Sequence, residues 1–581
     1  MWETRTHILR LITITNKSSS SSSSSPHDYV SVSAAMAAPP SSIDPNSGFC
    51  NANSIYYSLR PPLSLPSPSL PISIFSYVHS VLPSPPPLYP AIILSSSSSS
   101  SSSSFPLLLS QISSLAASLR SHLRISKGDV VYILAPTSLE IPILYFALLS
   151  IGAVVSPSNP LSSPDEIAHQ LRLTNPSIAF TTASFASKLP HHLTVVLLDS
   201  PLFRSFLERG SPSLPPIETT QHDPAAILYS SGTTGRVKGV VITHRNLVAV
   251  IAGYLASREA NPLENGPGVT LFTIPLFHVF GFFMIIRSIA LGETAVLMEK
   301  VDLPSILRAV QAHRVRTIPV SPPLVLALAK SDLVLKFDLS SLEGLGCGGA
   351  PLRRELAELF SARFPSVNIH QGYGLTESCG SAATQLDPEE CRVFGSTGKL
   401  SAGLEAMIVD PSTGEALPPG RQGELWLRGP NIMRGYIGDD EATAATLDSE
   451  GWLKTGDLCY FDQNGFLFIV DRLKELIKYK AYQVPPAELE QILQSHPEIA
   501  DAAVIPYPDE EAGQIPLAFV VRQPGSSITE NQIMDFVAKQ VSPYKKIRRV
   551  VFISSIPKSA AGKILRRELV NYALSPPTSK L

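Results

Sequence analysis

The 581-residue sequence contains few cysteines, and they form no recognisable redox or metal motif. The cysteines are far apart in the chain, and no two of them make a Cys-x-x-Cys pair. An odd number of scattered cysteines argues against a disulfide framework and against a structural zinc site. We therefore expect five reduced, buried thiols, at Cys50, Cys347, Cys379, Cys391 and Cys459.

Charged residues are also scarce, at 16% of the sequence, and the formal net charge is only −2. No block of basic residues resembles the footprint of a nucleic-acid-binding protein, so we expect no nucleic-acid partner. Hydrophobic residues make up 44% of the chain, which allows a large core and excludes a wholly disordered protein. The length alone predicts about three or four folding units.

Long hydrophobic runs are missing as well. The apolar stretch 141–155 is interrupted by Pro142 and Gly152, and the stretch 271–286 is interrupted by Pro275. Both fall short of the roughly 18 uninterrupted apolar residues that a membrane-spanning helix needs. We interpret both stretches as buried core and expect no transmembrane segment.

Two serine-rich tracts have little to bury. Residues 1–45 are rich in serine, proline and alanine and include the run Ser18–Ser25, so we expect a disordered extension. Its basic residues and few acids resemble a transit peptide, but an upstream extension with an effective start at Met36 explains them equally well. The second tract, Ser95–Ser104, interrupts foldable sequence and is interpreted as a loop insertion.

Beyond Pro106 the hydrophobic pattern alternates between helical and strand periods. The predicted helices are 108–123, 139–151, 165–171, 304–313 and 352–364, the last with a stripe of Leu352, Leu356, Leu359 and Phe360, and the predicted strands are 130–134, 153–155, 178–180 and 317–320. Continuous apolar strands that alternate with helices indicate a parallel sheet covered on both faces. This region is predicted to be a large doubly wound α/β domain.

The pattern changes after the loop at 394–398. Predicted strands at 406–409, 423–427 and 466–470 indicate a β-rich subdomain over about 395–470. The remaining chain is predicted to be a small α+β domain with helices at 487–494 and 530–540 and strands at 502–505, 517–522 and 550–553, where Thr529 and Gln532 form a capping box and Ile528 and Ile533 a hydrophobic staple. The expected organisation is an extension (1–45), a large domain (46–470), a small lid domain (471–575) and a tail (576–581).

One loop has the composition of a phosphate-binding site. A short apolar strand, Ile227–Tyr229, runs into a series of small residues with Lys238 after them: Ser230, Ser231, Gly232, Thr233, Thr234 and Gly235. Small residues let successive backbone N–H groups approach an anion, and the lysine adds a positive charge. The spacing differs from the Walker pattern. An ordinary Ser/Gly turn is the alternative, and the density of small residues favours phosphate.

Five other stretches are unusually polar or constrained. Glu377, in IHQGYGLTES, could hold Mg²⁺ beside substrate phosphates, or be a solvated loop glutamate. Asp457, in GWLKTGD, could bind ribose hydroxyls, although a plain turn aspartate is the better interpretation in isolation. The basic residues of 471–480 could be a solvated surface. Lys563, in PKSAAGK, could enter an active site or begin a helix. His278, among aromatics, is a catalytic candidate, although a satisfied core histidine is the better interpretation in isolation.

Together these stretches resemble the adenylate-forming enzymes, which include acyl-CoA synthetases, luciferases and peptide-synthetase adenylation domains. YSSGTTGRVKG, QGYGLTE, GWLKTGD, DRLKELIKYK and PKSAAGK occur in the family's order and approximate spacing. The resemblance runs from about Ile43 to Arg567 and is strongest to the plant peroxisomal 4-coumarate–CoA ligase-like group. It implies ATP-dependent ligation of a carboxylic acid to coenzyme A through an acyl-adenylate, with Mg²⁺ as cofactor.

The resemblance also implies residue roles. ATP or AMP would be bound by Ser230, Ser231, Gly232, Thr233, Thr234, Lys238, Gln371, Gly372, Thr376, Asp457 and Arg472, and Mg²⁺ by Glu377. Lys563 would neutralise the carboxylate and α-phosphate during adenylation. The lid would rotate about Lys474, bringing Lys478 and Gln483 to catalysis and Lys300, Lys480 and Ala481 to coenzyme A.

The acid pocket implied by the resemblance departs from true 4-coumarate ligases. After His278, those enzymes carry a tyrosine where this chain has Phe280 and a small polar residue where it has Met284, and Gly349 replaces an alanine. Loss of a phenol partner disfavours a hydroxylated ring, because a buried hydroxyl needs a hydrogen bond. The pocket therefore favours an aliphatic or cyclopentenone-type acid over a hydroxycinnamate, within a predicted range of aliphatic, oxylipin-precursor and phenylpropanoid acids.

The last three residues, Ser579-Lys580-Leu581, match a peroxisomal address that an import receptor reads. A peroxisomal ligase is the expectation. The alternatives are a 4-coumarate–CoA ligase proper, a luciferase-like oxygenase that acts on the adenylate, and a non-enzymatic nucleotide-binding protein. A peptide-synthetase module would need a carrier domain after the small domain. Acid-dependent pyrophosphate release and oxygen-dependent light or peroxide distinguish these classes.

Overall fold

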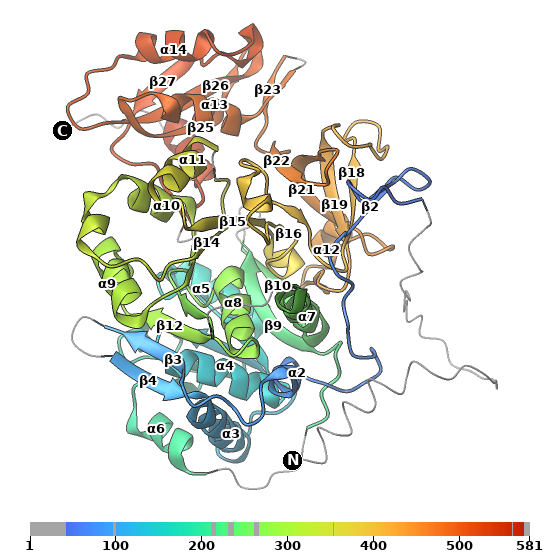
Figure 1. The fold of residues 1–581 in the computed structure, drawn as a ribbon, viewed down its shortest axis with the longest axis vertical. Helices are drawn as coiled ribbons and strands as arrows, with labels where there is room; N and C mark the ends of the chain where they lie inside the picture. Colours follow the sequence, from blue (N-terminus) through green and yellow to red (C-terminus); the bar gives the residue numbers. More distant parts are fainter. Residues whose placement is uncertain are drawn as a thin grey trace.

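The computed structural model describes residues 42–96, 100–210, 217–230, 237–260, 266–352, 354–480, 482–559 and 562–574. The described residues form four β-sheets with helices around them, and the last of these sheets belongs to a small part of the chain at the top of Figure 1. The expected α/β class, with a large N-terminal and a small C-terminal domain, is confirmed.

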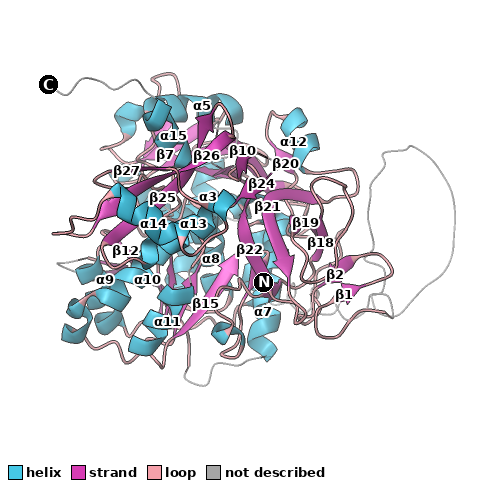
Figure 2. Ribbon diagram, turned by 90° about the horizontal axis from the view of Figure 1, so that it is seen from above, coloured by secondary structure: helices cyan, strands magenta, loops and turns pink. Residues whose placement is uncertain are grey.

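Helices occur between the strands along the whole described chain, and Figure 2 shows them surrounding the sheets. They are α2 (Ile74–Val81), α3 (Phe105–Ser121), α4 (Glu140–Ser150), α5 (Pro164–Thr174), α6 (Pro201–Glu208), α7 (His244–Ala260), α8 (Val279–Ala290), α9 (Leu303–His313), α10 (Pro322–Lys330), α11 (Arg354–Arg363), α12 (Asp440–Thr446), α13 (Pro486–Ser495), α14 (Glu530–Ala538) and α15 (Arg566–Leu574).

The first sheet is covered on both faces. Its described strands lie in the order β20 (Gly435–Tyr436), β10 (Lys238–Thr243), β9 (Pro224–Ser230), β6 (Val154–Pro157), β5 (Val130–Leu134), β7 (Ile178–Thr181) and β8 (Val195–Leu197), parallel from β9 to β8. In β5, Val131 and Ile133 share a core with α3 and α4, whereas Tyr132 and Leu134 pack with Ile167 of α5. Alternate residues of a strand face opposite sides, so the doubly wound prediction is confirmed.

The second sheet contains part of the serine tract. Its described strands are β17 (Lys399–Leu400), β16 (Ala383–Thr384), β15 (Asn368–Tyr373), β14 (Gly344–Cys347), β13 (Thr317–Val320), β11 (Val269–Leu271), β12 (Thr294–Met298), β3 (Pro90–Ser95) and β4 (Ser100–Ser104). The prediction of a loop insertion at Ser95–Ser104 is wrong, because β4 pairs antiparallel with β3 at the sheet edge. Backbone hydrogen bonds suffice there, and Ser103 is buried with its hydroxyl donating to Gln111.

The helix predicted over 352–364 is present, but its apolar stripe is narrower than expected. The helix α11 begins at Arg354, and Leu352 and Phe360 are buried at 3% and 0% exposure. Leu359 is 44% exposed, so its assignment to the stripe is wrong. The helix packs on the sheet through one face. Successive side chains of a helix point about 100° apart around its axis, so Leu359, next to the buried Phe360, points toward solvent.

The β-rich subdomain recruits strands from near the start of the described chain. Its antiparallel sheet has the order β1 (Phe49–Cys50), β2 (Ile55–Tyr57), β18 (Glu405–Val409), β19 (Gly423–Arg428), β21 (Leu453–Phe461) and β22 (Leu467–Arg472). The Tyr56 ring stacks on Phe461 with centroids 4.4 Å apart, and the Tyr56 hydroxyl donates to the Leu417 carbonyl. This packing joins the first described segment of the chain to the sheet whose last strand, β22, leads into the small domain.

The small domain has its own sheet and core. Its strands are β24 (Tyr482–Val484), β23 (Ile477–Tyr479), β26 (Gly513–Arg522) and β25 (Ile499–Asp509), with β27 (Arg549–Phe552) also paired to β26. The predicted capping box at Thr529 and Gln532 is confirmed, and it begins α14. Residues 473–476 connect β22 of the large domain with β23 of the small domain.

The cysteines and apolar stretches agree with the sequence analysis. All five cysteines are described, free and buried, and burial raises the pKa of the Cys347 thiol to about 12. Within the described ranges, no helix is long and apolar enough to cross a membrane. The same ranges hold no group of three or more histidine, cysteine and acidic side chains that could bind a metal ion by themselves.

Candidate active site

Two strands of the β-rich sheet bring the predicted ribose ligands together. Asp457 on β21 and Arg472 on β22 are register partners, and Arg472 Nε lies 3.3 Å from Asp457 Oδ1. The Tyr373 hydroxyl donates to Asp457 Oδ2 at 2.6 Å. Asp457 is 3% exposed, and burial raises its pKa against the attraction of Arg472. The carboxylate is therefore a buried, oriented acceptor rather than the solvated turn residue that its Thr-Gly context indicated.

Lys563 joins this cluster from the small domain. Burial is the main cause that lowers the pKa of Lys563 to about 8, and the neighbouring Arg472 lowers it further, whereas Glu475 and Asp457 oppose the shift. Gly562, with φ +80°, forms the turn before the lysine, and a Cβ there would lie 3.3 Å from the Ser321 hydroxyl of the large domain. The loop of Lys563 is thus docked on the large domain, with the lysine among the predicted nucleotide ligands.

A second cluster joins the predicted metal ligand to the phosphate lysine. The Tyr436 hydroxyl donates to Glu377 Oε1 at 2.9 Å, and Lys238 Nζ lies 4.5 Å from the centroid of the Tyr436 ring. The sequence analysis missed Tyr436, because no motif surrounds it and its partner Glu377 is 59 positions away. The tyrosine brings the cation that would hold phosphate beside the carboxylate that would hold Mg²⁺.

The predicted phosphate loop connects two antiparallel strands. Ser230 ends β9 and Lys238 begins β10, and the two residues are register partners. The loop therefore joins a hairpin rather than a strand and a helix, which agrees with the absence of a Walker pattern. The predicted ligands Ser231, Gly232, Thr233 and Thr234 lie outside the described residues.

The segment 371–378 links the two clusters. Gln371 and Gly372 lie on β15, Tyr373 ends this strand at Asp457, and Thr376 begins the short turn of helix that carries Glu377. The turn is too tight for a side chain at Gly374, where a Cβ would lie 2.3 Å from the Gly380 carbonyl oxygen. The motif QGYGLTE thus places Tyr373 in the cluster with Asp457 and Glu377 in the cluster with Tyr436.

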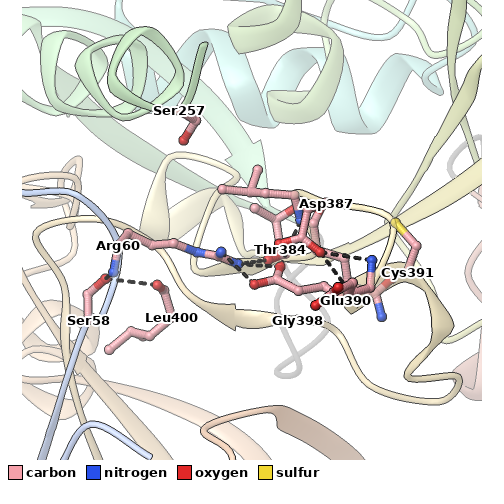
Figure 3. A network of polar contacts seen from close by, with 12 residues as sticks. Ser58, Arg60, Ser257, Thr384, Asp387, Glu390, Cys391, Gly398 and Leu400 are labelled. Carbon is pink, nitrogen blue, oxygen red and sulfur yellow. Dashed lines mark hydrogen bonds and ion pairs between the residues drawn. The ribbon is translucent and has the colours of Figure 1, made fainter. Parts of the chain in front are cut away.

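An ion pair from outside the motifs supports this segment. Arg60 binds Glu390 through both carboxylate oxygens at 2.7 Å, and it also donates to the Thr384 carbonyl at 2.7 Å (Figure 3). Thr384 is the register partner of Gly372. Arg60 therefore fastens β16, the strand that pairs with Gly372 and Tyr373 of β15.

The predicted acid pocket lies at the start of α8. His278 is the N-cap residue of this helix, and its Nδ1 accepts the Phe280 N–H at 3.3 Å. Burial lowers the pKa of His278, so the imidazole is neutral near pH 7. The Phe280 ring faces Gly348, because a Cβ built there would lie 3.5 Å from Phe280 Cε1. His278 therefore has a structural partner as well as its predicted place in the pocket.

Two further pocket candidates occupy different settings. Met284, one turn after Phe280, packs partly buried against the main core. Gly349 has φ +82°, a backbone conformation that favours glycine. The structure thus brings Phe280 to Gly348, the residue before Gly349, with apolar side chains along α8.

Another set of predicted residues lies away from this site. Lys478 and Gln483 are register partners on β23 and β24, and both are exposed. Lys480, in the turn between them at φ +51°, pairs with Glu511 at 2.9 Å, and Ala481 lies outside the described residues. Lys474 is exposed in the 473–476 connection.

Lys300 is also separate from the clusters around Asp457 and Glu377. Its side chain is 81% exposed, and its Nζ lies 2.7 Å from Asp302, the N-cap residue of α9. Among the described residues, the structure thus brings nucleotide candidates into two clusters, around Asp457 and around Glu377, and leaves Lys300 and Lys480 at the surface.

The donor types fit a nucleotide with a magnesium ion. Mg²⁺ in such sites takes one or two carboxylates and completes its shell with phosphates and water. Glu377 supplies one carboxylate beside Lys238, and Asp457 supplies a separate buried acceptor at which hydroxyl groups of a ribose could donate. Arg472 and Lys563 add positive charge near Asp457.

Two family models match the chain. The model described as AMP-binding enzyme matches residues 86–437, and the model described as AMP-binding enzyme C-terminal domain matches residues 488–563. The 4-coumarate–CoA ligase-like 9 of Arabidopsis thaliana is 55% identical over 553 residues, covering 93% of this chain and 98% of that protein. The peroxisomal OPC-8:0-CoA ligase 1 of Arabidopsis thaliana is 44% identical over 554 residues, covering 92% and 99%.

Solved structures agree with these matches. ATP-bound MatB from Rhodopseudomonas palustris aligns with a TM-score of 0.78 and 26% identity, covering 86% of this chain and 98% of that one. The o-succinylbenzoate CoA synthetase of Bacillus subtilis, in complex with its acyl-adenylate intermediate, aligns with a TM-score of 0.75 and 25% identity, covering 88% and 99%.

Proposed function

The chain belongs to the family of AMP-binding enzymes and is an AMP-forming acid–CoA ligase, and from this premise we propose how its residues divide the reaction. In the first step, a carboxylate oxygen of the acid bonds to the α-phosphorus of ATP, and pyrophosphate leaves. In the second step, the thiol sulfur of coenzyme A bonds to the acyl carbon of the adenylate, and AMP leaves.

The observation that carries the first half is the partial burial of Lys563 in the field of Asp457 and Arg472. In the proposal, Asp457 holds the ribose, and Lys563 places its charge at the reacting carboxylate and α-phosphate. Glu377, oriented by Tyr436, holds Mg²⁺, and Lys238 binds the β- and γ-phosphates. Bound Mg²⁺ supplies charge neutralisation for the leaving pyrophosphate.

The second half uses the opposite side of the small domain. Lys478 and Gln483 face solvent while Lys563 occupies the nucleotide site, so the arrangement seen serves adenylation alone. We propose that the small domain turns about the 473–476 connection after adenylation. Lys478 and Gln483 then reach the adenylate, with Lys480, Ala481 and Lys300 at coenzyme A.

For the acid, we propose an aliphatic or cyclopentenone-type substrate. The Phe280 ring packs at Gly348, and Met284 continues the apolar face one turn later, so neither position supplies a partner for a ring hydroxyl. A relative that is 44% identical is a peroxisomal OPC-8:0-CoA ligase, which is consistent with a substrate of this kind.

A panel of acids tests the substrate. We expect kcat/KM for pyrophosphate release to be higher with a medium-chain fatty acid or a cyclopentenone oxylipin precursor than with 4-coumarate, because a buried phenol hydroxyl without a partner costs about 1–3 kcal/mol. Cinnamate, which lacks this hydroxyl, is the matched control. A clear preference for 4-coumarate would assign the chain to the 4-coumarate–CoA ligases proper, and oxygen-dependent light or peroxide would favour an oxygenase.

We further propose that the ligase works in peroxisomes, through recognition of Ser579-Lys580-Leu581 by the import receptor. The named peroxisomal relative supports this location. In plant cells, a fluorescent protein fused before the chain should enter peroxisomes. Adding two residues after Leu581 should leave the fusion outside them, because the receptor reads a free terminus. Unchanged peroxisomal import of the extended fusion would rule out this address.

A further inference from the structure

The helix α13 of the small domain is capped by a residue of the large domain. Its own N-cap residue is Pro485, which offers no side-chain acceptor, and the first helical residue, Pro486, has no N–H. The first free N–H, at Ala487, donates to Asp471 Oδ2 at 2.9 Å. Asp471 lies on β22 in the β-rich sheet, so this cap crosses the boundary at 473–476.

The same helix holds the chain that follows Lys563. Glu490, one turn after Ala487, is 5% exposed and accepts Arg566 Nη2 at 2.8 Å on each carboxylate oxygen. Glu490 Oε1 also accepts the Val504 N–H at 2.8 Å, which fixes the carboxylate against β25. Arg566 is the first residue of α15, three positions after Lys563.

Asp471 lies between α13 of the small domain and the nucleotide site of the large domain. Neighbouring residues of a strand face opposite sides, so Asp471 meets α13 while Arg472 meets Asp457 in the nucleotide site. Arg566 also binds Glu475 in the 473–476 connection. Asp471 is 7% exposed. A second hydrogen bond from α13 to the large domain, from Gln491 to Glu355 at 3.0 Å, is exposed.

We infer that Asp471 is a positioning residue that sets Lys563 in the nucleotide site by capping α13 across the domain boundary. The path runs from Asp471 to the Ala487 N–H, along α13 to Glu490, and through Arg566 to the lysine loop. The inference rests on the proposed function, because it assigns the cap to the adenylation step. A turn of the small domain about 473–476 separates Asp471 from Ala487, so the cap favours only the arrangement with Lys563 inserted.

Measurement of the two half-reactions with the full-length enzyme tests this inference. We expect Asp471→Ala to lower acid-dependent pyrophosphate release roughly fivefold, the factor that corresponds to loss of one helix cap. Formation of thioester from chemically prepared acyl-adenylate and coenzyme A should be unchanged or faster, because that step does not use the cap. Asp471→Asn should restore pyrophosphate release, because its amide oxygen still accepts the Ala487 N–H.

A cap within the small domain provides the matched control. Thr529 accepts the Gln532 N–H at the start of α14, and the hydrogen bonds of its side chain stay within the small domain. Thr529→Ala should lower the thermal stability of the protein by a similar amount and leave the ratio of the two half-reactions unchanged.

Four outcomes would overturn the inference. Equal losses in both half-reactions with Asp471→Ala, or a change in their ratio with Thr529→Ala, would make the cap a matter of general stability. Failure of Asp471→Asn to restore pyrophosphate release would show that the hydrogen bond to Ala487 does not matter. Absence of acid-dependent pyrophosphate release from the unaltered enzyme would overturn the proposed function, and the inference with it.

Discussion

Replacement of Lys563 by alanine should reduce acid-dependent pyrophosphate release by about 10²- to 10³-fold, the usual effect of removing one fixed charge at a developing anion. The ammonium is partly buried and interacts electrostatically with Asp457 and Arg472 in the arrangement that we propose for adenylation. Thioester formation from preformed acyl-adenylate should persist, because the proposal assigns that step to Lys478 and Gln483. Both half-reactions are measured separately on the folded variant.

The pH profile provides the control for this substitution. The pKa of Lys563 is lowered to about 8, so the ammonium is lost as pH rises through that value. For the unaltered enzyme, kcat/KM for ATP in the adenylation step should fall above about pH 8, since kcat/KM reports ionisations of the free enzyme. In Lys563→Arg the guanidinium stays charged, so this alkaline decline should disappear. Equal loss of both half-reactions in Lys563→Ala would contradict the proposed division of roles.

Replacement of Glu377 by glutamine should raise the Mg²⁺ concentration that half-saturates pyrophosphate release by at least about tenfold. A tenfold change corresponds to a loss of about 1.4 kcal/mol in the free energy of Mg²⁺ binding. The amide still accepts the Tyr436 hydroxyl but lacks the negative charge that a divalent cation prefers. The measurement is a magnesium titration at saturating ATP and acid.

Tyr436→Phe is the matched control for Glu377. This change keeps the carboxylate and the aromatic ring beneath Lys238 but removes the hydroxyl that orients Glu377. It should shift the magnesium requirement less than Glu377→Gln does. A magnesium titration that is identical for the unaltered enzyme and Glu377→Gln would remove Glu377 from the metal site.

Local patterns predicted the elements whose residues carry their own signals. The strand at 130–134 and the strand at 317–320 match β5 and β13, because continuous β-branched and apolar residues fit a sheet covered on both faces. The start of α14 followed from its capping box, in which both partners are three residues apart. Where patterns were ambiguous, packing decided: the serine tract became an edge strand, and Leu359 faced solvent.

The order and spacing of five short motifs determined the family, the two-step reaction and the identity of most candidate residues. Residue type and short-range spacing are properties of the chain itself, so the sequence carries them directly. Only the tertiary structure decided which candidates lie together. It placed Lys563 with Asp457 and left Lys478 exposed, and it added Tyr436 beside Glu377 and Asp471 beneath α13. These contacts join residues that are distant in the chain or lie in different domains, where sheet register and domain docking determine distance, and no local pattern encodes either.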